Sequence, residues 1–357
     1  MSTSHSTGQP SRPSGTMTAA VLYAPHDLRI EQRPVPIPSA GEVLVRILSV
    51  GVCGSDVHYY EHGRIGDFVV RNPLVLGHES SGQIVKVGKG VSPTRVGERV
   101  AIEPGEPCGR CDQCRAGRYN LCADIKFHGT PPVDGTLAEF VTVKSELAYR
   151  VPDEISDNAA ALLEPLSVGI WANRKAGTQI GTSLLIAGAG PIGLVTTKVA
   201  RAMGAIRIAV TDVNRNRLSA ALASGATEIV VAGTDDVGGE FDAFIDCSGS
   251  PAAIDSGVRS VRSAGSVVLV GMGADELMLP LGVIQQRELV ITGTFRYANT
   301  WPTAIALAAS GRVSLDDLVT GEYGLADVER ALTAGRDPQS VKVVVRPAIG
   351  TRLVPKQ

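Results

Sequence analysis

Four of the six cysteines lie close together, in the spacing Cys108-x2-Cys111-x2-Cys114-x7-Cys122. Four thiolates in one short lobe match the tetrahedral ligand set of a structural zinc ion. The lobe has few apolar residues of its own, so metal binding can supply its folding energy. An iron–sulfur cluster and reduced, metal-free thiols are the alternatives. The spacing favours zinc over both.

A second group of candidate metal ligands is spread along the chain. Cys53 and His78 each follow an apolar run, in "GVCGSD" and "LVLGHESSG". We expect both runs to be strands, whose ends at glycine turns can bring ligands together at a cleft. A catalytic zinc ion needs three protein ligands and one open position, where an alcohol oxygen binds and loses its proton more readily. Taken alone, His78 would fit a hydrogen-bonded core histidine better, but beside Cys53 the ligand interpretation is favoured.

The number of thiols limits the ligands of this second site. Cys247 ends the apolar run "DAFIDCSG" and is interpreted as a small buried residue or as part of a cofactor-lining loop. Cys53 is then the single thiolate left, and the ligands beyond it and His78 should be oxygen atoms or water. Glu79 and Glu164, the latter in "LLEPLSVG", are the available carboxylates.

A glycine-rich motif follows the apolar run "SLLIA". Gly188, Gly190 and Gly193 form G-x-G-x-x-G, and Asp212 comes nineteen residues after the last glycine. In a strand–turn–helix context this motif binds a dinucleotide pyrophosphate at the helix N-terminus. The acidic residue accepts the ribose hydroxyls and repels a 2′-phosphate, which favours NAD over NADP. Arg217 would lie beside the adenine or in solvent, and a glycine turn without a nucleotide is the weaker alternative.

The candidate residues lie in two regions of the chain, which have different sequence patterns. Short apolar runs separated by Gly and Pro from residue 17 to about 150 predict a β-rich region, and a helix is expected over 156–176. From 183 onward, apolar strands alternate with helices, which predicts a parallel, doubly wound sheet. The run "VKVVVRP" near the C-terminus predicts a strand that rejoins the first region.

Composition excludes several classes of protein. The net charge of −2 and the 4% aromatic content give no basic surface or stacking platform for nucleic acid, and no sign of binding to an anionic membrane. No apolar run is long enough to span a bilayer. Residues 1–16 lack the apolar segment of a signal peptide, so we expect a disordered tail and a cytoplasmic protein.

Longer strings of residues match a known family. "GVCGSDVHYYEHGRIGDFVV", "LVLGHESSG", "RVAIEPG", "LLEPLSVGI", "AGAGPIG" and "GTFRYANTWP" resemble the medium-chain zinc-dependent dehydrogenases, and among them sorbitol dehydrogenase and related polyol dehydrogenases. The resemblance implies an α/β protein with a GroES-like β-rich catalytic domain over 17–165 and 304–357. It also implies a doubly wound Rossmann domain over 166–303.

The resemblance also implies roles at matched positions. Cys53, His78 and Glu79 would ligate the catalytic zinc, and Glu164 would hold the zinc-bound water or substrate, or ligate zinc in some states. Ser55 would take part in proton transfer from the alcohol. Contacts to the polyol are implied for Tyr59, Glu164, Arg296 and Tyr297. Contacts to NAD are implied for Gly188, Gly190, Ile192, Gly193, Asp212, Arg217, Val270, Gly271, Met272, Thr294, Phe295 and Arg296.

The implied reaction is oxidation of a secondary hydroxyl of a polyol to a ketose, through a zinc-bound alkoxide and hydride transfer to NAD. Mammalian sorbitol dehydrogenases lack most of the lobe cysteines, whereas this chain keeps all four and resembles a two-zinc member. Alternatives are another secondary alcohol, such as threonine, a butanediol or an alkanol, or a non-catalytic NAD-binding protein. A homo-oligomer, tetramer or dimer, is implied by resemblance only. His58 and His62 are expected at the cleft edge or the surface.

Overall fold

The computed structural model describes residues 15–234 and 237–347. The first fourteen residues of the predicted tail, and residues 348–357 of the predicted catalytic domain, lie outside this range. The predicted tail, residues 1–16, extended too far, because Gly15 and Thr16 belong to the fold. Thr16 begins strand β1, and the carbonyl of Gly15 accepts a hydrogen bond from the amide of Val35. Both residues belong to the fold, because their backbone pairs with the chain at the end of β2: Thr16 lies opposite Pro34, and Gly15 bonds Val35.

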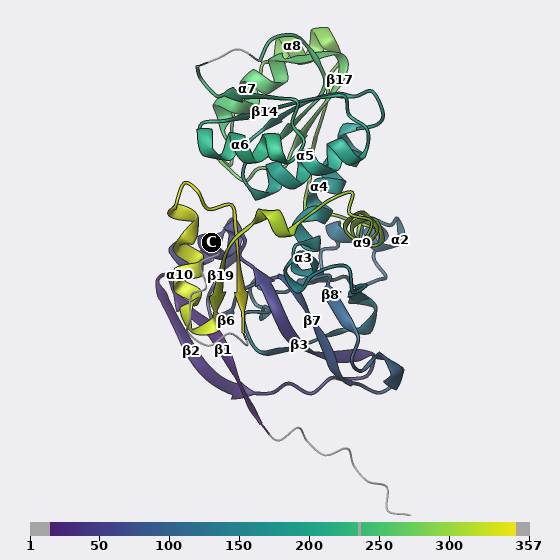
Figure 1. The fold of residues 1–357 in the computed structure, drawn as a ribbon, viewed down its shortest axis with the longest axis vertical. Helices are drawn as coiled ribbons and strands as arrows, with labels where there is room; N and C mark the ends of the chain where they lie inside the picture. The colour runs from purple at the N-terminus through teal and green to yellow at the C-terminus, as the bar shows by residue number, and fades with distance from the viewer. Residues whose placement is uncertain (1–14, 235–236, 348–357) are drawn as a thin grey trace, which may run out of the picture.

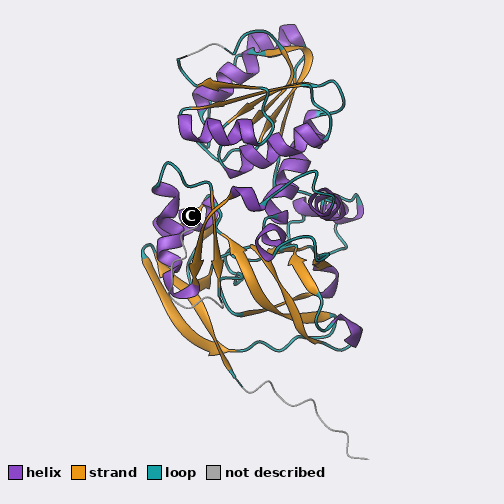
Figure 2. Cartoon of the chain, in the orientation of Figure 1, coloured by secondary structure: helices purple, strands orange, loops and turns teal. Residues whose placement is uncertain are grey.

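The lower part of the molecule is β-rich (Figure 1, Figure 2). A three-stranded sheet has the order β2-β1-β6, and a mixed seven-stranded sheet has the order β12-β8-β7-β3-β20-β19, with β11 also paired to β3. The strands are β1 (Thr16–Ala24), β2 (Asp27–Pro34), β3 (Glu42–Gly51), β6 (Leu74–Val75), β7 (Glu79–Val87), β8 (Arg99–Ile102), β11 (Phe140–Lys144), β12 (Ala148–Arg150), β19 (Val319–Gly324) and β20 (Lys342–Arg346). Two antiparallel strand pairs complete this part: the short hairpin of β4 (Arg64–Ile65) with β5 (Phe68–Val69), and β9 (Gly105–Glu106) with β10 (Lys126–Phe127), which enclose the cysteine lobe.

The predicted return of the chain to this region is confirmed. Strand β20 runs antiparallel to β3, with Val344 opposite Gly51 and Val345 opposite Val50. The side chains of Val344 and Val345 are fully buried. The last described strand therefore lies inside the seven-stranded sheet, between β19 and β3, the strand that leads to Cys53.

The upper part is a six-stranded, all-parallel sheet with the order β15-β14-β13-β16-β17-β18. Helices cover both of its faces (Figure 2), which confirms the doubly wound prediction. Its central strand β13 reads as a continuous apolar run because Leu184 and Ile186 pack into one core cluster and Leu185 and Ala187 into another. The strands are β13 (Ser183–Ala187), β14 (Arg207–Asp212), β15 (Glu228–Val231), β16 (Phe241–Asp246), β17 (Val261–Leu269) and β18 (Val290–Gly293).

Ten α-helices occur in the described residues. They are α1 (Gly54–His62), α2 (Asp112–Arg115), α3 (Asp157–Ala161), α4 (Leu163–Ala176), α5 (Pro191–Ala202), α6 (Arg215–Ala223), α7 (Pro251–Arg259), α8 (Leu281–Arg287), α9 (Trp301–Ala309) and α10 (Val328–Thr333). The predicted domain boundaries at 165/166 and 303/304 fall within α4 and α9, which pack against each other. No described helix is long and apolar enough to cross a bilayer.

The helix expected over 156–176 is two helices, α3 and α4, separated at Leu162. Pro165 explains the break, because proline has no N–H to donate to the carbonyl of residue 161 and its ring crowds that carbonyl. Ser156 caps α3, since its hydroxyl accepts a hydrogen bond from the amide of Ala159. Helix α4 then begins directly before Glu164.

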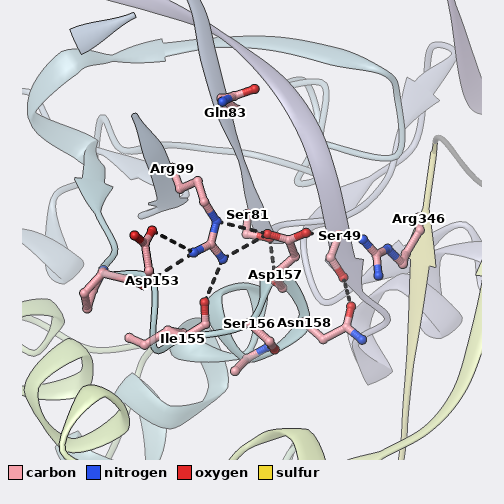
Figure 3. A network of polar contacts seen from close by, with 12 residues as sticks. Ser49, Ser81, Gln83, Arg99, Asp153, Ile155, Ser156, Asp157, Asn158 and Arg346 are labelled. Atoms are coloured by element: carbon pink, nitrogen blue, oxygen red, sulfur yellow. Dashed lines mark hydrogen bonds and ion pairs between the residues drawn. The ribbon is translucent and has the colours of Figure 1, made fainter. Parts of the chain in front are cut away.

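A polar network fixes the start of α3 (Figure 3). The guanidinium of Arg99 donates to Asp157 Oδ1 at 3.0 Å and to the carbonyl of Ile155 at 2.7 Å. Arg346 donates to the other oxygen of the same carboxylate at 3.2 Å. Strands β8 and β20 therefore hold the helical segment that carries Glu164.

Candidate zinc and dinucleotide sites

The seven-stranded sheet brings Cys53, His78 and Glu79 together at one of its ends. Cys53 follows β3 and is the N-cap residue of α1, and Glu79 begins β7 opposite Gly51 of β3. One ligand atom of each of the three residues lies within 4.8 Å of the others. A thiol, an imidazole and a carboxylate at this spacing are a suitable donor set for zinc, since three protein ligands leave a fourth position open.

Asp56 organises this group and was not anticipated from the sequence. Its buried carboxylate accepts hydrogen bonds from the amides of Cys53 and Gly77, both at 2.9 Å. Its Oδ1 also lies 3.7 Å from Nδ1 of His78. Burial alone would lower the pKa of His78, but the charges of Asp56 and then Cys53 outweigh it and raise the pKa to about 10. The carboxylate of Asp56 therefore favours a positive charge at His78, the position where a divalent cation would bind.

Lys342 of β20 is the second unanticipated residue. Its ammonium donates to Glu79 Oε1 at 2.6 Å and to the carbonyl of Val52 at 2.8 Å. Glu79 Oε2 lies at the same ion-pair distance but accepts no hydrogen bond from the described residues. Lone pairs on this buried carboxylate thus stay available to a metal ion.

Glu164 lies deeper, in the first turn of α4, and is outside the close group of three. Burial, opposed by His78 and reinforced by Glu79, raises the pKa of Glu164 to about 7. Tyr297 is also buried, and burial together with the neighbouring Glu164 raises its pKa well above the usual value. A carboxyl group with a pKa near neutrality can hold or release a proton at physiological pH.

Two further predicted substrate residues lie in this region. Tyr59 is buried on α1, and burial raises the pKa of its hydroxyl. The guanidinium of Arg296 stacks 3.6 Å above the ring of Phe127, which itself contacts His78. Arg296 Nη1 is buried and donates no hydrogen bond to any described residue. An unpaired guanidinium nitrogen of this kind can bind a hydroxyl-rich ligand.

The remaining residues of α1 behave as expected or are less informative. His58 and His62 are exposed, with their rings 5.5 Å apart, in agreement with the surface prediction. Ser55 is half-buried in the first turn of α1, two residues after Cys53.

The four lobe cysteines also come together. Their sulfur atoms all lie within 4.8 Å of one another, with Cys111 and Cys114 at 3.5 Å and Cys108 and Cys114 at 4.0 Å. Sulfurs of a zinc tetrahedron are separated by about 3.8 Å when each Zn–S bond is ~2.3 Å. Amide hydrogen bonds from Arg110 and Cys111 lower the pKa of Cys108 to about 6, which favours the thiolate. The lobe therefore fits a structural zinc ion.

The glycine motif forms the turn between β13 and α5. Gly188 has a φ of +96°, and a Cβ on Gly193 would lie 1.8 Å from the carbonyl oxygen of Gly188. A Cβ on Gly190, the N-cap of α5, would meet nothing within 4 Å. Gly188 and Gly193 thus allow a tight turn, and Gly190 leaves the helix N-terminus open to a phosphate. Ile192 is half-buried in the first turn of the helix.

A cavity of about 890 Å³ extends from this turn along the edge of the parallel sheet. Its lining includes Gly188, Gly190, Asp212, Arg217 and Cys247. The carboxylate of Asp212 accepts hydrogen bonds from the amides of Ala189 and Asn214, both at 2.7 Å. This pairing fixes the acidic group beside the motif, where it can accept ribose hydroxyls.

The segments predicted near the nicotinamide lie together. The amide of Thr294 donates to the carbonyl of Leu269, which precedes Val270. Gly271 and Met272 pack closely on Gly249, since a Cβ on Gly249 would lie 2.2 Å from the carbonyl oxygen of Met272. Thr294 and Val270 are half-buried, whereas Met272 and Phe295 are exposed.

Comparison with known proteins identifies the two parts of the chain. Residues 39–153 match the family described as alcohol dehydrogenase GroES-like domain, and residues 191–310 match zinc-binding dehydrogenase. The chain is 44% identical to sorbitol dehydrogenase of Bos taurus, over 91% of this chain and 95% of that protein. It is 42% identical to sorbitol dehydrogenase of Bacillus subtilis, over 93% and 97%.

Solved structures show the same fold. L-idonate 5-dehydrogenase of Escherichia coli superposes with a TM-score of 0.88 at 31% identity, covering 93% of this chain and 98% of that one. An alcohol dehydrogenase of E. coli complexed with NADH gives 0.88 at 28% identity, covering 93% and 100%. The 2R,3R-butanediol dehydrogenase of Bacillus subtilis gives 0.85 at 32% identity, covering 93% and 99%.

Fold, ligand sets and glycine turn together define a zinc-dependent dehydrogenase that uses a nicotinamide cofactor and acts on a small molecule. The predicted combination of a GroES-like domain with a Rossmann domain is confirmed. The chain belongs to the medium-chain zinc-binding dehydrogenases, the family whose members include the sorbitol dehydrogenases.

Proposed function

We propose that this enzyme oxidises a secondary hydroxyl of a polyol, of the sorbitol or xylitol type, to a ketose, with NAD as hydride acceptor. The observation that carries the proposal is the convergence of Cys53, His78 and Glu79 beside the buried Glu164. Sorbitol dehydrogenases are the relatives that match over almost the whole chain, which supports a polyol as substrate.

Cys53, His78 and Glu79 would hold the catalytic zinc. When bound, zinc supplies a Lewis acid that lowers the pKa of the substrate hydroxyl. Glu164, whose pKa is near 7, orders the water or hydroxyl next to this site. Ser55, two residues after Cys53, takes part in moving the hydroxyl proton towards solvent.

Polar side chains select the polyol. Arg296 directs its unpaired Nη1 at the substrate, and Tyr59 and Tyr297 offer buried hydroxyls. A site for a simple alkanol would have an apolar lining, whereas a guanidinium and two phenols satisfy several hydroxyl groups at once.

The cofactor is NAD, bound across the glycine turn. Gly188, Gly190 and Gly193 would accommodate the pyrophosphate, with Ile192 at the start of the helix. Asp212 would accept the ribose hydroxyls and repel the phosphate of NADP. Further NAD contacts are proposed for Arg217, Val270, Gly271, Met272, Thr294, Phe295 and Arg296.

The chain binds two zinc ions, the second at Cys108, Cys111, Cys114 and Cys122, and works as a homo-oligomer. The assembly is supported by the exposed Val290 on β18, an edge strand of the parallel sheet, and by the exposed Met278 and Leu281 in the preceding segment of the chain. An apolar sheet edge of this kind pairs readily with a second copy. Light scattering on the purified protein should give a dimer or a tetramer, and a monomeric mass would contradict the assembly.

A butanediol is the second candidate substrate, because the 2R,3R-butanediol dehydrogenase structure is also similar. Initial rates with NAD on sorbitol, xylitol, ribitol, galactitol, 2,3-butanediol, threonine and 2-propanol would separate the candidates. We expect kcat/KM for at least one polyol to exceed that for butanediol and 2-propanol by about tenfold, roughly the effect of one satisfied hydrogen bond. Absence of activity on every polyol would refute the proposal.

A further inference from the structure

The segment from Phe295 to Asn299, which carries Arg296 and Tyr297, is attached to the cysteine lobe. The side-chain amide of Asn120 donates to the carbonyl of Phe295 at 2.8 Å. At the other end of the segment, the amide of Asn299 donates to the hydroxyl of Tyr119 at 2.8 Å. Figure 1 shows α2 of the lobe next to α9, which follows this segment.

A third contact strengthens the attachment. The side chain of Asn299 donates to the carbonyl of Gly117 at 2.9 Å. The lobe therefore binds the segment at both ends, through residues 117 to 120, and Arg296 lies between the two attachment points. These contacts join parts of the chain that are about 180 residues apart.

The segment needs such support because its backbone is strained. Arg296 and Asn299 both have a φ of +56°, the left-handed region that non-glycine side chains rarely adopt. Conformations of this kind persist where the surroundings over-determine them. The hydrogen bonds at Phe295 and Asn299 fix the peptide groups next to these two left-handed residues.

The lobe side of the attachment is rigid. Asn120 is buried, and the hydroxyl of Tyr119 donates to Glu103 Oε1 at 2.9 Å. Glu103 is buried at the end of β8 and also hydrogen-bonds Tyr149. The hydroxyl oxygen of Tyr119 therefore makes two hydrogen bonds, one with Asn299 and one with Glu103. Through them it connects the segment 295–299 to the seven-stranded sheet.

We propose that Tyr119 and Asn120 of the cysteine lobe are positioning residues for the substrate. They hold Arg296 and Asn299 in their left-handed conformations, so that Arg296 stacks on Phe127 and presents Nη1 to the polyol. The inference rests on the proposed polyol oxidation and extends it: the lobe sets substrate selectivity in addition to stabilising its own loop.

Two variants test this role: Tyr119→Phe, which removes the oxygen between Asn299 and Glu103, and Asn120→Ala, which removes the donor to Phe295. The matched control is Tyr149→Phe. It also removes a buried hydroxyl beside Glu103, but the Tyr149 ring stacks on Trp301 and its hydroxyl faces Glu103 rather than the segment. A purely structural role of the lobe predicts similar changes in all three variants.

The first readout is the Michaelis constant for the polyol against that for 2-butanol, which has one hydroxyl and does not need Arg296. We expect the polyol KM to rise about five- to tenfold in Tyr119→Phe and Asn120→Ala, the scale of one lost hydrogen bond. The KM for 2-butanol, and both constants in Tyr149→Phe, should change less than about twofold. Equal changes for both alcohols, or in the control, would overturn the inference.

The second readout does not depend on the substrate. Amide hydrogen exchange of the peptide covering residues 294–300, measured without ligands on the full-length protein, should be faster in the two variants than in wild type or Tyr149→Phe. Unchanged exchange would refute the positioning role even if no polyol were oxidised. If exchange is faster in the two variants but the wild-type enzyme oxidises no polyol, the positioning role of the lobe is supported and only the proposed function is refuted.

Discussion

The ammonium group of Lys342 lies 2.6 Å from both carboxylate oxygens of Glu79, and both side chains are buried. The pair joins β20, near the end of the described chain, to β7 at the candidate zinc site. Burial opposes the charge of Lys342, but the Glu79 carboxylate outweighs it and raises the pKa of the lysine. The ammonium therefore fixes the orientation in which the side chain of Glu79 lies close to Cys53 and His78.

Replacement of Lys342 by Met should destabilise the protein strongly. The variant leaves Glu79 buried without its cation, which typically costs about 3–5 kcal/mol. Urea unfolding of the protein after removal of its zinc ions measures the change, because a zinc ion bound to Glu79 would itself neutralise the carboxylate. Lys198→Met is the matched control, because Lys198 is also buried but its partner Asp317 is half exposed. A loss for Lys342→Met no larger than for the control would contradict the role of the pair.

Asp212→Asn should weaken the preference for NAD. The amide keeps an oxygen for the backbone N–H of Ala189 but removes the charge that repels a 2′-phosphate. We expect the ratio of kcat/KM for NAD to that for NADP to fall about tenfold, the scale of one charge-assisted hydrogen bond. Asp242→Asn is the control, since Asp242 accepts from the amide of Ser183 at the other end of β13. An unchanged ratio in Asp212→Asn would contradict the assignment.

Arg99→Met should lower stability by about 1–3 kcal/mol, because it removes the donor to the carbonyl of Ile155 and to one oxygen of the partly buried Asp157. Arg99 bonds Asp157 and the carbonyl of Ile155 (Figure 3). Asp153→Asn provides the comparison: this carboxylate is fully exposed and lies 3.8 Å from Arg99, so its loss should cost less than about 0.5 kcal/mol. Thermal unfolding of both variants tests the difference, and equal melting temperatures would count against the network.

Glu103 should make stability depend on pH. Burial raises its pKa from 4.5 to about 7, opposed by hydrogen bonds from Tyr119 and Tyr149. The folded state therefore binds a proton more tightly than the unfolded state, so this contribution is full below about pH 4.5 and is lost as the pH rises to 7. In the Glu103→Gln variant, which stays neutral, the decrease in stability between pH 5 and pH 8 should be smaller by about 1–3 kcal/mol. An identical pH profile in wild type and variant would contradict the shift.

The local signals in the sequence were sufficient for most of the fold. Gly188 and Gly193 lie in a motif whose strand and helix are contiguous with it, and alternation of strands and helices predicts a parallel sheet. Cys108 to Cys122 are close in the chain, so their spacing already limits how they can meet. The terminal strand was recognisable because Val343, Val344 and Val345 are apolar at consecutive positions, as strands buried on both faces are.

Contacts between segments far apart in the chain could not be predicted from the sequence in this way. Lys342 looks like a solubilising residue in an apolar strand, and only the pairing of β20 with β3 brings it to Glu79. Asp56 had a weak signal, since an acidic residue three positions after Cys53 suits the third position of a helix. The attachment of Asn120 to Phe295 spans 175 residues and leaves no periodic or spacing signal.

The most direct test of the proposed chemistry is zinc content and polyol oxidation, measured on the same samples of wild type and Cys53→Ala. The variant removes one ligand of the catalytic group and leaves the four lobe cysteines intact. We expect about two zinc ions per chain in wild type and about one in the variant, with turnover of the polyol reduced by at least about a thousandfold. Full turnover in Cys53→Ala, or equal zinc content in both proteins, would contradict the assignment of Cys53, His78 and Glu79 as the catalytic zinc site.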